Sequence, residues 1–261
     1  MQATLTFLGS GTSMGVPTLG CDCAVCHSTD PRDQRLRPSV RIDWNGHTVL
    51  IDTGPDFRQQ ALRSGMERVD AVFYTHHHAD HLLGLDDLRP LSYGNHKAGA
   101  PLPLYADEAT ATAMERIFDY TFRADADYPN RARVILHRLK GPVELFGVRF
   151  EPVALKHGRL NVTGYRFGDG AYLTDMNVIP EASLAKLQGL DLVVLDALRA
   201  RPHTSHATVA ESIEWSRKLA PAQTYFTHMS HELPHAETEA QLPSGIHLAY
   251  DGLQVPFRIA R

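Results

Sequence analysis

The chain has 261 residues, of which 43% are hydrophobic and 21% are charged, so it can bury a sizeable core and is not a disordered segment. Its formal net charge at pH 7 is −4, which argues against a broadly basic surface that holds nucleic acid by neutralising phosphates. No apolar run approaches the ~20 residues of a membrane helix, and the N-terminus lacks a signal-peptide pattern. We therefore expect a cytoplasmic protein without membrane contact, and we disfavour a nucleic-acid partner.

Short β-prone segments alternate with amphipathic segments along the whole chain, without a repeat or a linker. We predict strands at residues 4–8, 39–43, 48–52, 71–75, 102–105, 134–136, 148–154, 162–167, 171–174, 192–196, 224–227, 246–249 and 253–257. We predict helices at 55–64, 81–85, 109–122, 181–186 and 206–219, the last one capped by Thr204 or Ser205. This mixture has no strict strand–helix–strand period, which favours a layered α/β sandwich built as a single domain over residues 1–261.

Histidine is the unusual residue, with 15 copies, and the segment 75–81 reads Thr-His-His-His-Ala-Asp-His. His76 and His78 project to the same side of an extended chain, and Asp80 and His81 follow as the chain turns into a helix. Nitrogen and oxygen ligands in this spacing suit zinc, manganese or iron. A surface histidine run does not explain an acid between histidines directly after an apolar strand, so we interpret the segment as a metal site.

The pattern His-x-His-x-Asp-His resembles the signature of the metallo-β-lactamase superfamily, and later segments match the remaining motifs in the family's order. The resemblance implies an αββα sandwich and a hydrolase with two metal ions. The implied ligands are His76, His78, His157 and Asp175 for the first metal, and Asp80, His81, Asp175 and His228 for the second. Asp52 matches an aspartate of the first motif, where a carboxylate accepts an N–H from a ligand histidine and fixes its tautomer.

Three cysteines, Cys21, Cys23 and Cys26, lie within six positions. An odd and closely spaced set of this kind is unsuited to disulfide bonds and well suited to binding a metal ion, and we call it the cysteine clip. Thiolates in the spacing C-x-C-x-x-C can hold three corners of a tetrahedral zinc, and the site needs one further ligand. A closed site has no open position for a substrate, so we expect a structural zinc that fastens a loop at about 20–27. The preferred fourth ligand is His231, and the alternatives are His27, His203 and His235.

A glycine-rich segment, residues 9–17, follows the first predicted strand and lacks the Gly-Lys-Ser/Thr of a nucleotide-binding loop. This segment and the cysteine clip together resemble the PhnP-type phosphodiesterases, which hydrolyse 5-phosphoribosyl 1,2-cyclic phosphate and act on 2′,3′-cyclic nucleotides. The resemblance implies a small phosphodiester substrate, a place in phosphonate catabolism, two catalytic Mn²⁺ or Zn²⁺ ions and one structural Zn²⁺. Relatives are often dimers, which leaves a homodimer open.

His206 resembles the family's late histidine, a proton donor to the leaving group, and we place it at the start of the helix 206–219. A helix dipole lowers the pKa of a histidine there, and Asp196 nearby can raise it again. We expect the loss of His206 or Asp80 to cost far more turnover than the loss of Cys23. Arg199 and Arg201 are candidates for contact with a terminal phosphate.

Three other functions share parts of these motifs. A tRNA 3′-processing endonuclease shares the metal ligands, but the chain shows no basic glycine-rich arm and carries net negative charge. A β-lactamase, thioesterase or lactonase is disfavoured by Asp80 and by the phosphodiesterase-like N-terminal segment. A non-catalytic carrier like some proteins of the coenzyme PQQ pathway is disfavoured because the ligands of both metals are intact. The sequence decides neither the physiological substrate nor the identity of the catalytic metals.

Overall fold

The computed structural model describes residues 1–94, 99–123 and 129–260 of the chain. Its strands are β1 (Gln2–Gly9), β2 (Ser39–Trp44), β3 (His47–Ile51), β4 (Ala71–Phe73), β5 (Leu102–Ala106), β6 (Val134–Arg138), β7 (Val143–Leu145), β8 (Val148–His157), β9 (Leu160–Phe167), β10 (Gly170–Leu173), β11 (Leu192–Asp196), β12 (Gln223–Thr227), β13 (Ile246–Leu248) and β14 (Gln254–Arg258). Its α-helices are α1 (Phe57–Arg63), α2 (Ala79–Leu82), α3 (Arg89–Gly94), α4 (Glu108–Ile117), α5 (Asp119–Phe122), α6 (Glu181–Leu184), α7 (Val209–Leu219) and α8 (His235–Glu239). Short 3-10 turns occur at η1 (Pro31–Asp33), η2 (Leu85–Leu88) and η4 (Ala185–Leu187).

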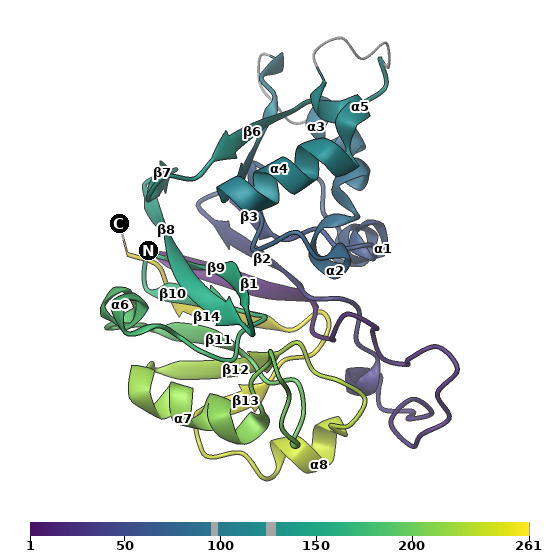
Figure 1. Ribbon diagram of the computed structural model, residues 1–261, viewed down its shortest axis with the longest axis vertical. Helices are drawn as coiled ribbons and strands as arrows, with labels where there is room; N and C mark the ends of the chain where they lie inside the picture. The colour runs from purple at the N-terminus through teal and green to yellow at the C-terminus, as the bar shows by residue number, and fades with distance from the viewer. Residues whose placement is uncertain (95–98, 124–128, 261) are drawn as a thin grey trace.

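Two seven-stranded sheets form the centre of the described part of the chain, in the orders β14-β1-β2-β3-β4-β5-β6 and β13-β12-β11-β10-β9-β8-β7. Figure 1 shows α1 to α5 gathered with the first sheet and α6 to α8 with the second. One apolar cluster lies between the sheets, and a further cluster lies under each helix layer. The predicted αββα sandwich and its single domain are therefore confirmed.

Aromatic stacking fixes the two sheets against each other. Phe73 of the first sheet stacks on Phe150 of the second and on Tyr105, each with ring centroids 4.7 Å apart. Tyr165 meets Phe73 edge-on at 5.0 Å, and its hydroxyl donates a hydrogen bond of 2.7 Å to the carbonyl of Tyr74. Such pairs add about 0.5–1.5 kcal/mol each beyond the area they bury. The aromatic core therefore sets where the strand ends of one sheet face those of the other.

Strands that carry candidate ligands end at a common edge. β3 runs parallel to β4 in the first sheet, and β10, β11 and β12 are parallel in the second. The carboxyl ends of parallel strands meet on one side of a sheet, where ligand sites of α/β proteins form. Asp52 and His76 follow strands of the first sheet, and Asp175 and His228 follow strands of the second.

The start of the last predicted helix is wrong, because α7 begins at Val209 rather than at residue 206. Thr208 caps the helix and forms a capping box with Glu211, in which each side chain bonds the backbone N–H of the other. Neither Thr204 nor Ser205 is the cap, because Thr208 is the residue directly before the first helical residue.

Other element boundaries differ less from the prediction. Every predicted strand has a counterpart, whereas β7, α3 and α8 were not predicted. The predicted helix 109–122 is divided into α4 and α5 at Phe118, whose φ and ψ of −112° and 47° are not helical. The predicted helix 81–85 begins two residues earlier, at Ala79. Within the described ranges, no helix is long and apolar enough to cross a membrane.

A glycine contact supports the loop that carries Asp80. A Cβ atom at Gly54 would lie 2.0 Å from the carbonyl oxygen of Asp80, so only glycine permits this approach. The backbone N–H of Thr53 donates to the carbonyl of His81 at 2.9 Å and ties the same two segments together. The segment after β3 thus positions the backbone of the two candidate ligands at α2.

The Gly54→Ala substitution should force the Asp80 segment away from the segment after β3. We expect the free energy of unfolding to fall by about 1–3 kcal/mol, as for other overpacked sites. Urea unfolding of the purified variant measures this change. Gly141→Ala is the matched control, because a Cβ atom there meets nothing within 4 Å. Equal stability of Gly54→Ala and Gly141→Ala would contradict the role given to Gly54.

Candidate metal centre

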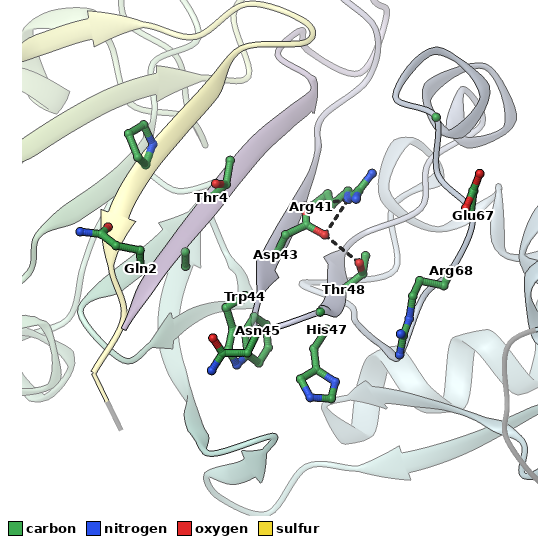
Figure 2. Close-up of a pocket in the computed structure, with 14 residues that line it drawn as sticks. Gln2, Thr4, Arg41, Asp43, Trp44, Asn45, His47, Thr48, Glu67 and Arg68 are labelled. Atoms are coloured by element: carbon green, nitrogen blue, oxygen red, sulfur yellow. Dashed lines mark hydrogen bonds and ion pairs between the residues drawn. The ribbon is translucent and has the colours of Figure 1, made fainter.

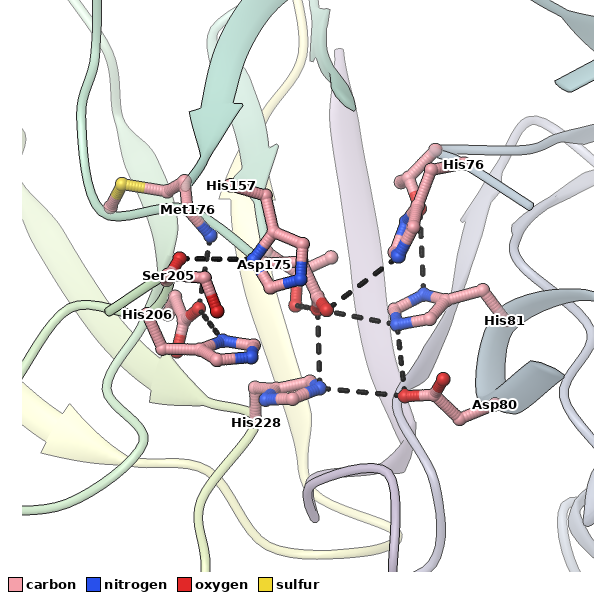
Figure 3. Close-up of polar contacts among 12 residues, drawn as sticks. His76, Asp80, His81, His157, Asp175, Met176, Ser205, His206 and His228 are labelled. Atoms are coloured by element: carbon pink, nitrogen blue, oxygen red, sulfur yellow. Dashed lines mark hydrogen bonds and ion pairs between the residues drawn. The ribbon is translucent and has the colours of Figure 1, made fainter. Parts of the chain in front are cut away.

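The Asp175 carboxylate lies in the middle of the candidate centre. Its Oδ1 lies 3.2 Å from Nε2 of both His81 and His228, and its Oδ2 lies 3.7 Å from Nε2 of His76. The side chain is 2% exposed, and the residue follows β10 with a left-handed φ of 52°. Figure 3 shows this carboxylate between two sets of side chains, one comprising His157, His206 and His228 and the other His76, Asp80 and His81.

One group of ligand atoms has the geometry of a tetrahedral metal site. The ligand atoms of Asp80, His81, Asp175 and His228 all lie within 4.8 Å of one another. Four nitrogen or oxygen ligands at ~2.1 Å from a zinc ion lie ~3.4 Å apart. The four close pairs in this group are 3.2 to 3.5 Å apart. The separations therefore fit a metal ion held by all four residues.

Buried atoms without partners support the same conclusion. Among the described residues, Nε2 of His76, His81 and His228 and Oδ2 of Asp80 are buried and make no hydrogen bond. A buried polar atom that lacks a partner costs about 1–3 kcal/mol, and such atoms rarely converge on one point without a ligand. A divalent cation held by Asp80, His81, Asp175 and His228 would satisfy three of these atoms, and Nε2 of His76 belongs to the adjacent group with His78 and Asp175.

The first predicted ligand set is only partly assembled. The ligand atoms of His76, His78 and Asp175 form one group, whereas His157 groups with Asp175 and His206. The ring of His157 lies 5.3 Å from that of His78, and its Nδ1 donates to the carbonyl of Ser205 at 2.9 Å. This bond leaves Nε2 of His157 as the nitrogen able to bind a metal. Its assignment to the first metal stays a prediction.

Asp52 orients His81 through the ring nitrogen that faces away from Asp175. Its Oδ2 accepts a hydrogen bond from Nδ1–H of His81 at 2.7 Å and another from the hydroxyl of Thr75 at 2.8 Å. Its Oδ1 accepts from the backbone N–H of Thr75 at 2.8 Å. Because Nδ1 of His81 donates, Nε2 carries the lone pair that faces Asp175. The position of Asp52 therefore agrees with the expected support of a ligand histidine.

His206 lies beside the metal ligands and is paired with Asp196. Nδ1 of His206 lies 2.7 Å from Oδ2 of Asp196, which also accepts from the backbone N–H of Met176 at 3.0 Å. The ring of His206 lies 4.4 Å from that of His157 and 4.7 Å from that of His228. His206 stands outside α7, and at the start of this helix the N–H of Glu211 is taken up by the capping box and that of Val209 by the carbonyl of Arg199. Asp196, rather than the helix dipole, is therefore its main electrostatic neighbour.

The pKa shifts of the buried acids and histidines show that the site favours positive charge. Burial alone would raise the pKa of Asp175, but His228 and His81 hold it well below its usual range. Burial alone would lower the pKa of His228, but Asp175 and Asp80 raise it to about 9. Burial lowers the pKa of His76 well below its usual value, and the nearby His81 adds to this effect. The buried acids thus attract positive charge, which divalent cations supply.

The three cysteines and His231 form a second group. Nδ1 of His231 lies 3.2 Å from Sγ of Cys21 and 3.5 Å from Sγ of both Cys23 and Cys26. Sulfur and nitrogen ligands of a tetrahedral zinc lie ~3.6 Å apart. The backbone N–H of Cys26 helps to lower the pKa of Cys23 to about 6, whereas burial raises the pKa of Cys26 to about 11. The structure places His231 in this group, and the alternatives His27, His203 and His235 lie outside it.

A buried arginine on the C-terminal side of the cysteine loop binds the His231 segment. The side chain of Arg35 is 0% exposed and donates to the carbonyls of Ser230 at 2.8 Å and Leu233 at 2.6 Å. It also pairs with Asp33 at 3.2 Å. Nothing in the sequence distinguishes this arginine from exposed ones, so its role was not predicted.

Two further sequence features have structural positions. Gly11 of the glycine-rich segment pairs with Met229, so this segment packs beside His228. Arg199 and Arg201 both pair with Glu232, at 3.4 and 2.8 Å. Both guanidinium groups are thus engaged by one carboxylate within the protein, which weakens the hypothesis that they contact a phosphate.

A pocket on the first sheet is separate from the metal centre. Figure 2 shows Arg41, Asp43 and Thr48 in this pocket, where the Asp43 carboxylate accepts from Arg41 at 2.9 Å and from Thr48 at 2.7 Å. None of the residues described as its lining is a candidate metal ligand. We therefore assign it no role in catalysis.

The fold and the two ligand groups define a metallo-β-lactamase-type hydrolase. A family model described as a β-lactamase superfamily domain matches residues 47–229. A solved structure described as a diphosphatase from the PhnP family is 54% identical, covers 100% of this chain and 99% of that chain, and superimposes with a TM-score of 0.94. The chain therefore belongs to the PhnP family within the β-lactamase superfamily.

Curated relatives are longer than the region they share with this chain. An octanoyltransferase of Porphyromonas gingivalis is 39% identical over 95% of this chain and 50% of its own length. A ribonuclease Z of Methanococcus maripaludis is 28% identical over 48% of this chain and 35% of its own length. The chain thus spans about half the length of the first relative, and the shared region is about a third of the second.

The Cys23→Ser variant tests the cysteine group. We expect it to lose about one zinc ion per chain. We also expect its melting temperature to be roughly 5–10 °C lower, because each loss of about 1 kcal/mol in the free energy of unfolding lowers the melting temperature of a domain this size by 2–4 °C. Elemental analysis and thermal unfolding measure the two effects. Asp22→Asn, between the cysteines and outside the ligand group, is the control. Unchanged zinc content in Cys23→Ser would show that the cysteines hold no zinc.

Proposed function

We propose that this protein is a metal-dependent phosphodiesterase that hydrolyses small cyclic phosphodiesters, such as 5-phosphoribosyl 1,2-cyclic phosphate or 2′,3′-cyclic nucleotides. The observation that carries the proposal is that Asp175 belongs both to the group with Asp80, His81 and His228 and to the group with His76 and His78, with the His206–Asp196 pair beside it. A centre for two cations and an adjacent proton donor is what the hydrolysis of an unactivated phosphate diester requires.

Each residue has a distinct role in this reaction. When bound, two divalent ions lower the pKa of a water molecule and neutralise the non-bridging oxygens of the phosphate. Asp175 contributes to both ligand groups, and Asp52 fixes the tautomer of His81. The aromatic core keeps the strand ends in place, so these ligands need little rearrangement when the substrate binds.

His206 is the proton donor in this proposal. Its Nδ1–H donates to Asp196, so Nε2 is the nitrogen available to the substrate. The carboxylate of Asp196 fixes the orientation of the ring, so that Nε2 is the nitrogen that can carry the proton to be transferred. As the P–O bond breaks, negative charge grows on the leaving oxygen, and Nε2–H transfers its proton there. The histidine remains hydrogen-bonded to Asp196 as a neutral ring.

A diphosphate ester is the second candidate substrate. The PhnP-family structure with 54% identity is described as a diphosphatase, and cleavage of a diphosphate also proceeds by attack at phosphorus. The leaving phosphate of a diphosphate is a weaker base than a sugar alkoxide, so it needs less help from a proton donor. The close His206–Asp196 pair therefore favours the diester with an alkoxide leaving group.

The activities named for the two longer relatives are not expected of this protein. The octanoyltransferase matches this chain over only half of its length, so the name does not assign acyl transfer to this region. The ribonuclease Z similarity covers 48% of this chain, and the net charge of −4 gives little attraction for tRNA. We expect no octanoyl transfer from a thioester donor and no cleavage of precursor tRNA by the metal-loaded protein.

His206→Ala should separate substrates by their leaving groups. We expect turnover of a 2′,3′-cyclic nucleotide to fall by about 10²–10⁴-fold, because its alkoxide needs a proton. Turnover of bis(p-nitrophenyl) phosphate should fall by less than about tenfold, because p-nitrophenolate leaves without one. His247→Ala is a control, because His247 is an exposed histidine paired with Glu239 at 2.8 Å.

Two outcomes would count against this account. Equal losses on both substrates would show that His206 acts on metal binding or structure rather than as a proton donor. If the wild-type protein, loaded with Mn²⁺ or Zn²⁺, turned over diphosphate esters but no phosphodiester, hydrolysis of diphosphates would replace the proposed function.

A further inference from the structure

The loop at residues 203–206, which carries the proposed proton donor, contacts the end of β8. Nδ1–H of His157 donates to the carbonyl of Ser205 at 2.9 Å, and Figure 3 shows the two residues side by side. A Cβ atom at Gly158 would lie 3.1 Å from Cβ of Ser205, so the backbones also approach closely. The positions of His157, a predicted metal ligand, and of His206 therefore depend on the same small interface.

The segment directly after Asp175 is hydrogen-bonded to both sides of this interface. On one side, the backbone N–H of Asn177 donates to the carbonyl of Lys156 at 2.9 Å. On the other side, the carbonyl of Met176 accepts from the backbone N–H of Ala207 at 2.8 Å. Lys156 and Ala207 are the sequence neighbours of the two histidines at the interface. The segment thus lies where it can set the backbone positions of both.

The side chain of Asn177 spans the interface. Its Oδ1 accepts from the backbone N–H of Gly158 at 3.0 Å, and its Nδ2 donates to the carbonyl of Thr204 at 3.4 Å. One partner is a donor and the other is an acceptor, so the bridging group must offer one of each. A carboxamide does so, whereas an ionised carboxylate of the same size only accepts. The half-buried Asn177 therefore links the turn after β8 to the loop at residues 203–206.

We propose that Asn177 is a positioning residue, which aligns His157 toward a metal ion and His206 toward the leaving oxygen. This inference rests on the proposed function, because that function gives His206 its role in proton transfer. Hydrogen bonds behind a ligand histidine commonly change metal affinity or activity by about 10–100-fold. Asn177 acts through the turn and the loop, and its side chain takes no part in the reaction itself.

The Asn177→Ala variant removes both side-chain hydrogen bonds. We expect one of the two catalytic Mn²⁺ ions to bind about tenfold more weakly, because His157 loses its alignment. With saturating Mn²⁺, turnover of a 2′,3′-cyclic nucleotide should fall by about 10–10²-fold, and turnover of bis(p-nitrophenyl) phosphate by less than about threefold. Steady-state assays measure turnover. Mn²⁺ affinity is measured by calorimetric titration of protein with an emptied catalytic centre and an intact cysteine clip.

The Asn177→Asp variant separates the two contacts. It keeps the acceptor for the N–H of Gly158 and places an oxygen against the carbonyl of Thr204 in place of the donor. Mn²⁺ should bind at least as tightly as to the wild type, because the turn is still held and a negative charge is added. Turnover of the cyclic nucleotide should nevertheless fall selectively, as in Asn177→Ala. Wild-type turnover of the cyclic nucleotide by Asn177→Asp would contradict the alignment of His206.

Asn161→Ala is the matched control. Asn161 lies on β9, is exposed, and its side chain accepts from Nζ of Lys156 at 2.6 Å. Its loss should leave Mn²⁺ binding and both turnover rates unchanged. A merely structural role of Asn177 would lower the free energy of unfolding without separating the two diesters. Equal losses of turnover on both diesters, or wild-type Mn²⁺ affinities in Asn177→Ala, would overturn the inference.

The Mn²⁺ titrations need no substrate, so they distinguish a failure of this inference from a failure of the proposed function. Weaker Mn²⁺ binding in Asn177→Ala, without turnover of any phosphodiester by the wild-type protein, would remove the proposed function and sustain the alignment of His157. Turnover of both diesters by Asn177→Ala at wild-type rates would sustain the function and remove the inference.

Discussion

The Asp175 carboxylate lies 3.2 Å from nitrogens of His81 and His228 and 3.7 Å from a nitrogen of His76, and it is 2% exposed. A buried carboxylate in this position is stable only when positive charge surrounds it. The two sheets bring that charge from opposite sides, since His76 and His81 follow strands of one sheet and His228 follows a strand of the other. The metal centre is therefore also a junction between the two halves of the sandwich.

The cysteine group extends this junction to the N-terminal loop. His228 and His231 lie in one short segment, so the ligand of one site and the ligand of the other cannot move independently. Arg35 ties the same segment to the N-terminal loop through the carbonyls of Ser230 and Leu233. A zinc ion at the cysteines would thus stabilise the position of His228, although it touches no substrate. We infer that stability and catalysis are coupled through these few residues.

Much of the fold and of the site could be predicted from the sequence, because Asp52, Asp175 and His228 each follow a β-prone segment closely and the other catalytic ligands cluster in the segment 75–81 or at the end of β8. The start of α7 could also have been predicted, because Thr208 and Glu211 have the Thr-x-x-Glu spacing of a capping box, and the prediction at residue 206 missed this signal. Other features depend on contacts between distant segments. The orientation of His157 depends on the carbonyl of Ser205, which lies 48 positions away in the sequence. The burial of Arg35 likewise depends on partners almost two hundred positions away. Contacts of this kind leave no local pattern in the sequence.

The metal content of Asp175→Ala tests the central claim most directly. The variant and the wild-type protein are loaded with Zn²⁺ or Mn²⁺, dialysed and analysed for metal ions per chain, with circular dichroism as a check on folding. We predict that the variant loses both ions of the catalytic centre and keeps the zinc at the cysteines. A folded variant that retained both catalytic ions would contradict the account, because the site would then be assembled without the carboxylate between its two ligand groups.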